Sequence, residues 1–168
     1  MEAPHVQLMG SGAILREVLA AGDLLARDFD VTSDVWRTTS LTELLRDGLA
    51  AERWNLLHPD APARVPYVRQ CLDGRTGPVV VATDYMKIVG AQIRAFVDDR
   101  RFVSLGTDGF GRSDTREALR TFFEVDRHFI MITALKALAD DGTIPHARVG
   151  EAIRRYGIDI DKVDPATV

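Results

Sequence analysis

The run Pro78-Val79-Val80-Val81-Ala82 restricts the fold more than any other stretch of this sequence. Its apolar residues follow one another with no polar residue between them, which is typical of a parallel strand whose two faces are both covered. We therefore expect this run to be a central strand of an α/β domain.

The rest of the chain alternates between short apolar runs and longer segments of helical period. Further strands are expected over His5–Met9, Phe29–Trp36 and Phe102–Leu105, and three prolines predict an exposed loop over residues 53–66. The expected helix N-caps are Ser40, Thr83 or Asp84, Ser113 or Asp114, and Asp126. We predict one domain with an α/β fold, a three-layer sandwich around a mostly parallel sheet of four to five strands.

Composition narrows the class of protein. With 168 residues, of which 46% are hydrophobic, the chain can fill the core of one domain. A net charge of −4, with basic residues scattered among acidic ones, predicts no nucleic-acid partner. No apolar stretch is long enough for a membrane span, and the single Cys71 is expected to be a buried, unreactive thiol in a reducing compartment. We expect a cytoplasmic protein.

The stretch LGTDGFGRSD, residues 105–114, places three glycines between an expected strand and an expected helix. Glycines at such a turn supply positive φ angles, and this structural interpretation is favoured. A helix N-terminus after a glycine-rich turn can also bind an anion, so a phosphate site stays open as an alternative. The same two interpretations apply to Gly10-Ser11-Gly12, although neither turn has the G-x-G-x-x-G spacing.

Catalytic and metal motifs are not apparent. The four histidines are far apart in the sequence, and no G-x-S-x-G pattern surrounds a serine. A zinc site or a nucleophile would have to be assembled entirely by the fold.

Several ordered stretches resemble one family. ERWNLLHP, VVVATDYMK, LGTDGFGRSD and GIDIDKVDP are similar to the carboxyl-terminal domain of the decarboxylating component of pyruvate dehydrogenase, in its single-chain, homodimeric form. The resemblance implies a transketolase-like third domain of a larger three-domain enzyme. It also implies that the strand normally leading into this domain is missing, so that one edge of the sheet is altered.

In such an enzyme, the resemblance implies, thiamin diphosphate and Mg²⁺ lie between the first two domains, and the product passes to a lipoyl-bearing acetyltransferase. The family's thiamin diphosphate motif begins G-D-G and ends in two asparagines, whereas this chain has no G-D-G and a single asparagine, Asn55. We therefore expect no catalytic, cofactor-binding or metal residue here, and no activity of the chain alone. The implied role is structural, with the enzyme's other domains and a second copy as partners.

The residues expected to meet other domains are those of the glycine-rich stretch, at the carboxyl end of an expected parallel strand. They are Asp108, Phe110, Arg112 and Asp114. The alternative function is a regulatory module that binds a small anion or nucleotide at the glycine turns.

Overall fold

A computed structural model describes residues 3–168 and shows four parallel strands in the order β2-β1-β3-β4. The strands are β1 (His5–Gly10), β2 (Thr32–Arg37), β3 (Val79–Ala82) and β4 (Phe102–Leu105). The helices are α1 (Leu15–Phe29), α2 (Leu41–Leu57), α3 (Tyr67–Leu72), α4 (Lys87–Ala91), α5 (Arg116–Phe122), α6 (Arg127–Asp140) and α7 (Ala147–Arg155), with 3-10 turns η1 (Gly12–Ile14), η2 (Arg94–Phe96) and η3 (Pro165–Thr167). The predicted α/β fold is confirmed.

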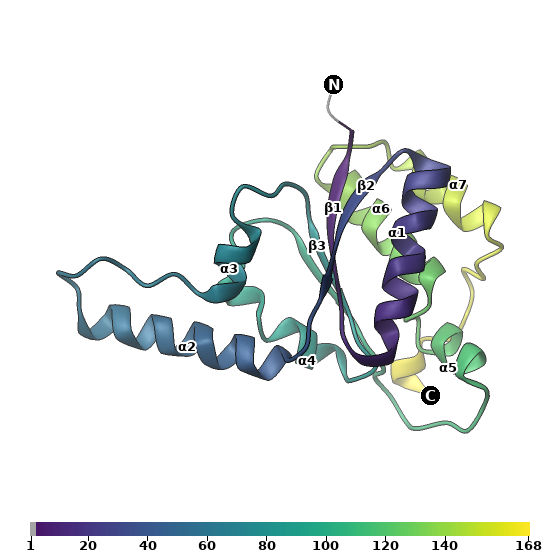
Figure 1. Cartoon of the computed structure of the whole chain (residues 1–168). Helices are drawn as coiled ribbons and strands as arrows, with labels where there is room; N and C mark the ends of the chain where they lie inside the picture. Colours follow the sequence, from purple (N-terminus) through teal and green to yellow (C-terminus); the bar gives the residue numbers. More distant parts are fainter. Residues whose placement is uncertain (1–2) are drawn as a thin grey trace.

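Strand β3 is covered on both faces, as its continuous apolar run predicts. Val80 and Ala82 pack into a core with α1 and α6, whereas Val79 and Val81 pack into a second core with α2, α3 and η2. Figure 1 shows the corresponding three layers, with α1, α5, α6 and α7 on one side of the sheet and α2, α3 and α4 on the other. None of the described helices is long and apolar enough to cross a membrane.

The strand order creates a switch point. Strand β1 lies between β2 and β3, and the strand order reverses at this point. The segment after β1 leads to α1 on one face of the sheet, whereas the segment after β3 leads to α4 and η2 on the other. Open α/β sheets usually present functional groups at the carboxyl ends of the strands at such a point.

Two predicted boundaries are wrong. The second strand begins at Thr32 rather than Phe29, because α1 continues to Phe29 and ends at Asp30, whose φ of 51° is left-handed. The loop expected from residue 53 begins later, because α2 continues to Leu57. No proline interrupts the chain between residues 53 and 58, so the helix continues until it approaches Pro59.

The predicted helix starts are half right. Ser40 accepts a hydrogen bond from the Glu43 N–H at 3.2 Å, and Asp126 accepts from the N–H groups of His128 and Phe129. By contrast, Thr115 caps α5 in place of Ser113 or Asp114, with its hydroxyl accepting from the Ala118 N–H at 3.2 Å.

The segment after β3 also departs from the prediction. Neither Thr83 nor Asp84 caps α4, which begins after Met86. The helical spacing of Met86, Val89, Ile93 and Phe96 predicts one helix with these residues on its apolar face, but the chain forms α4 and η2, and Met86 is exposed. Cys71, expected to be buried, is only half-buried.

Candidate functional site

The loops at the carboxyl edge of the sheet are hydrogen-bonded to one another. The Ser11 hydroxyl donates to the Thr83 hydroxyl at 2.9 Å, and both residues are buried. Thr107, after β4, donates its N–H to the Tyr85 carbonyl and its hydroxyl to the Asp84 carbonyl, each at 2.8 Å. These bonds fix the loops after β1, β3 and β4 relative to one another.

The glycines of the stretch 105–114 have different roles. Gly109 has a φ of +104°, and a Cβ there would lie 2.1 Å from the Pro165 carbonyl oxygen. A Cβ on Gly106 would lie 2.4 Å from the Tyr85 carbonyl oxygen, whereas one on Gly111 would meet nothing within 4 Å. The predicted positive-φ turn is confirmed. Because Gly109 has no side chain, Pro165 of the carboxyl-terminal segment can pack against its backbone.

Three of the four predicted site residues contact their own domain. The Asp108 carboxylate accepts from the Lys87 N–H at 3.2 Å and so holds the first turn of α4. The Arg112 guanidinium lies 4.0 Å from the centre of the Phe122 ring, and Asp114 accepts from the Thr115 N–H at 2.7 Å. Their contacts with other domains stay predictions.

Phe110 is the exception, because 81% of it is exposed. The aromatic ring therefore does not pack into the domain's own core. Tyr85, Met86 and Ile88, from the neighbouring loop and α4, are also exposed. Sequence reasoning did not single out Tyr85 or Ile88, and it placed Met86 on the buried face of a longer helix because of its helical spacing to Val89 and Ile93.

A cavity of about 410 Å³ opens at this edge, between the segments after β1 and β4 and helix α5. Its wall combines apolar side chains with arginines; the lining includes Ile14, Leu119, Phe123, Arg112, Arg116 and Arg120. Arg120 also forms an ion pair with Glu17, with 2.9 Å between Nη1 and Oε1. Burial raises the pKa of Glu17, but hydrogen bonds and charge from Arg127, with the charge of Arg120, outweigh burial and lower it.

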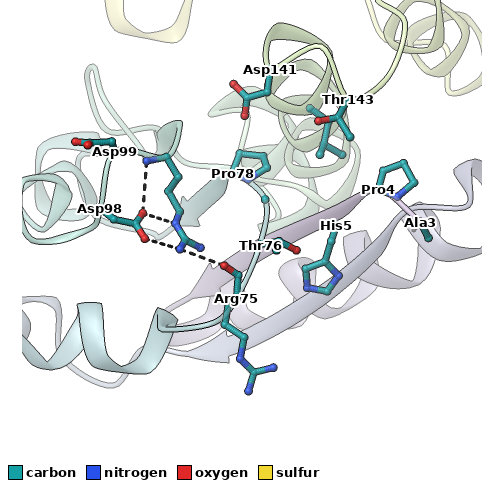
Figure 2. Close-up of a pocket in the computed structure, with 13 residues that line it drawn as sticks. Ala3, Pro4, His5, Arg75, Thr76, Pro78, Asp98, Asp99, Asp141 and Thr143 are labelled. Atoms are coloured by element: carbon teal, nitrogen blue, oxygen red, sulfur yellow. Dashed lines mark hydrogen bonds and ion pairs between the residues drawn. The ribbon is translucent and has the colours of Figure 1, made fainter. Parts of the chain in front are cut away.

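The opposite, amino-terminal edge holds a larger cavity of about 700 Å³. Figure 2 shows Asp98 and Asp99 on one side of it and Pro4 and His5 on the other. Asp98 is hydrogen-bonded to the Arg100 side chain, which also donates to the Arg75 carbonyl at 3.3 Å. Asp98 and Arg100 of this cavity are therefore paired with each other, while Asp141 pairs with Arg101 outside its lining.

The carboxyl-edge residues do not fit thiamin diphosphate and Mg²⁺. The Asp84 carboxylate lies 3.2 Å from where a Cβ of Gly12 would stand, so it would repel a diphosphate at that glycine turn. Residues 3–168 also contain no group of three or more His, Cys, Asp or Glu side chains that could hold a metal ion. No step of thiamin chemistry can be derived from these residues.

Sequence comparison gives one consistent result. Residues 1–126 match the family model described as the transketolase-like TK C-terminal domain. The chain is 56% identical to the pyruvate dehydrogenase E1 component of Pseudomonas aeruginosa over 163 residues, and 55% and 51% identical to those of Cupriavidus necator and Escherichia coli K12. These matches cover 95–99% of this chain but 18% of each relative, in its carboxyl-terminal part. The expected resemblance is confirmed.

Structural comparison supports the fold. A solved structure titled "Split gene transketolase, inactive beta4 tetramer" superposes with a TM-score of 0.55 at 18% sequence identity. The match covers 82% of this chain and 40% of that one. At this identity the likeness shows the fold alone.

Proposed function

Since the chain belongs to the family of transketolase-like C-terminal domains, we propose that it serves as the structural, dimer-forming carboxyl-terminal domain of a thiamin diphosphate-dependent pyruvate dehydrogenase E1 component. The observation that carries this proposal is the 56% identity to the Pseudomonas aeruginosa relative over 97% of this chain. The chain spans only 18% of that relative's length, so pyruvate decarboxylation would require the remaining polypeptide.

The carboxyl edge supports an architectural role. Its loops are locked by hydrogen bonds, while Phe110, Tyr85, Met86 and Ile88 are exposed beside them. Groups of exposed apolar side chains commonly mark protein interfaces. We propose that other domains of the E1 component cover this edge, with Phe110 as the main contact.

The proposed partners follow from the same assignment. A second copy of the E1 component would complete a homodimer, and the lipoyl-bearing acetyltransferase would meet the assembled enzyme in the cytoplasm. When its partner domains are absent, the exposed apolar surface should make the chain self-associate, which sedimentation over a range of concentrations would detect.

The alternative, an anion-binding regulatory module at the glycine turns, has less support. Asp84 lies against the Gly12 turn, and the backbone at Gly109 is packed against Pro165. Both turns are thus occupied by the protein's own atoms, and one of them faces a carboxylate.

The proposal is tested with the chain alone. We expect no heat of binding for thiamin diphosphate with Mg²⁺ in calorimetry and no pyruvate oxidation with an artificial electron acceptor. A thermal-shift screen with phosphate and nucleotides addresses the alternative, because a ligand at 100 times its dissociation constant stabilises by about 2.7 kcal/mol. Turnover by homogeneous protein would refute the architectural role, and a saturable phosphate shift would favour the regulatory one.

A further inference from the structure

The second half of α2 and the loop after it project from the body of the domain. We call residues 52–67 the distal arm. Figure 1 shows α2 and this loop extending away from the sheet, with the loop running back beside the helix toward α3. Not one of these residues is buried, whereas Ala51 and Val68, immediately outside the arm, are.

The arm is held in shape by its own contacts. The Trp54 ring stacks on His58 at a centroid distance of 4.4 Å, and the Arg64 guanidinium lies 4.3 Å from the Trp54 ring centre. Asn55 makes two hydrogen bonds to the Arg64 backbone, accepting from its N–H at 2.7 Å and donating to its carbonyl at 3.0 Å. The helix and the returning loop are therefore joined without the help of the core.

The base of the arm is fixed as well. The Asp47 carboxylate accepts from the Tyr67 N–H at 2.6 Å, and the Gln70 side chain donates to the Val65 carbonyl at 2.6 Å. A projecting segment with such contacts is preorganised, so docking would cost little conformational entropy.

The surface of the arm combines exposed apolar side chains with charged ones whose charges cancel. Leu56 is 79% exposed, and Leu57, Val65 and Tyr67 are each about half exposed. The charged side chains of residues 52–67 form an even set of two acids and two bases: Glu52, Asp60, Arg53 and Arg64. Such a surface fits an apolar groove rather than a polyanion or a strongly charged protein.

We propose that the distal arm docks into an apolar groove on the polypeptide that precedes this domain in an E1 component, with Leu56 and Leu57 as the buried contacts. This inference rests on the proposed function. Because the chain spans 18% of its relatives, most of such a polypeptide lies outside these residues. A covalently linked groove also has a high effective concentration, which favours it over a groove on a second copy.

The test uses limited trypsin digestion, because Arg53 and Arg64 provide cleavage sites within the arm. The chain alone is compared with a chimaera in which it replaces the matched segment of the Pseudomonas aeruginosa E1 component. We expect arm cleavage to be at least ten-fold slower in the chimaera. The double variant Leu56→Gln/Leu57→Gln should abolish that protection while leaving the melting temperature of the chain alone unchanged, since both leucines are exposed.

Leu19→Gln is the matched control, because Leu19 is 50% exposed on α1, outside the arm. The control should keep the protection. Equal cleavage in chain and chimaera, or protection that survives the double variant, would overturn the inference. Protection of the chain alone that rises with its concentration would identify a second copy as the occupant, which also overturns it.

Pyruvate oxidation by the chimaera distinguishes failure of the two proposals. An active chimaera whose arm is cleaved freely would refute the docking inference and leave the E1 assignment intact. A folded but inactive chimaera would count against the E1 assignment itself.

Discussion

The two edges of the sheet differ in the side chains that they expose. At the amino-terminal edge, charged side chains pair within the chain: Asp98 with Arg100, Asp141 with Arg101, Asp140 with Lys136 and His146, and Asp28 with Arg155. At the carboxyl-terminal edge Glu17 pairs with Arg120 and Arg127, and the loops are joined by hydrogen bonds that mostly involve backbone groups. Four large apolar side chains are nevertheless exposed there: Phe110, Tyr85, Met86 and Ile88. This difference supports the proposal that other domains of an E1 component cover the carboxyl edge rather than the amino edge.

The largest effect is expected at the turn that supports the carboxyl edge. Gly109→Val should lower the free energy of unfolding by about 2–4 kcal/mol, because the turn would hold valine at an unfavourable positive φ and its Cβ would collide with the Pro165 carbonyl. Urea denaturation of the chain alone measures the change. Gly111→Val is the control and should have a much smaller effect, since open space surrounds Gly111. Equal losses in the two variants would refute the special role of Gly109.

At the amino edge, Arg100→Met should destabilise the chain by about 2 kcal/mol. The Arg100 side chain is 14% exposed, and its loss would remove the cation paired with Asp98 and the side-chain donor to the Arg75 carbonyl. Arg75→Met is the control, because the Arg75 guanidinium is half exposed and its contacts are long: 3.4 Å to the Asp34 carboxylate and 5.6 Å to the centre of the Trp36 ring. A harmless Arg100→Met would mean that this edge does not depend on its ion pairs.

The carboxylates of the amino edge should also make the stability of the fold depend on pH in the acidic range. Hydrogen bonds from Arg27 and Tyr156 lower the pKa of Asp28 to about 2, and hydrogen bonds from Lys136 and His146 lower that of Asp140 to about 2. Because these pKa values lie below the ordinary value of 3.8, both carboxylates stabilise the fold above pH 4 and lose that contribution as the pH falls toward 2. Thermal melts from pH 5 to pH 2 should show a declining melting temperature, with a shallower decline in Asp28→Asn. A decline of the same steepness in that variant would exclude Asp28 as a source.

The cap of α5 should contribute less. Thr115→Ala is expected to cost about 1 kcal/mol, because the hydroxyl that accepts from the Ala118 N–H is removed. Ser113→Ala, two residues earlier in the same loop, should be nearly neutral. If urea denaturation gives the reverse order, then Ser113 caps the helix in solution.

The smallest effect on the chain alone is expected at Phe110. Phe110→Ala should change the melting temperature very little, because the side chain is 81% exposed. In the chimaera with the Pseudomonas aeruginosa relative, the same substitution should weaken assembly or pyruvate oxidation. Unfolding of the chain alone by Phe110→Ala would show that the ring packs into its own domain.

The central features of the fold could be predicted because they depend on local pattern. The run 78–82 indicates a strand covered on both faces, and the capping pattern at Ser40 needs only residues three apart in sequence. The end of α1 could not be placed, because a left-handed Asp30 leaves no clear signal in the apolar pattern around Phe29 and Val31.

The candidate site was predicted less completely. Three residues in a row, Ser113, Asp114 and Thr115, can each cap a helix, and their chemistry does not say which one does. Tyr85 and Met86 are exposed ahead of α4, which begins only at Lys87, and the helical spacing of Met86, Val89 and Ile93 conceals this late start. Asp108 holds α4 through a contact between residues far apart in sequence, and only the fold reveals it.

One measurement tests the architectural role most directly: the pyruvate oxidation rate of the chain alone and of the chimaera in which it replaces the matched segment of the Pseudomonas aeruginosa E1 component, which is 56% identical to it. We predict no turnover above background for the chain alone. The chimaera should oxidise pyruvate at a rate comparable to that of the parent enzyme. Turnover by the chain alone, or a folded and assembled chimaera without activity, would contradict the assignment.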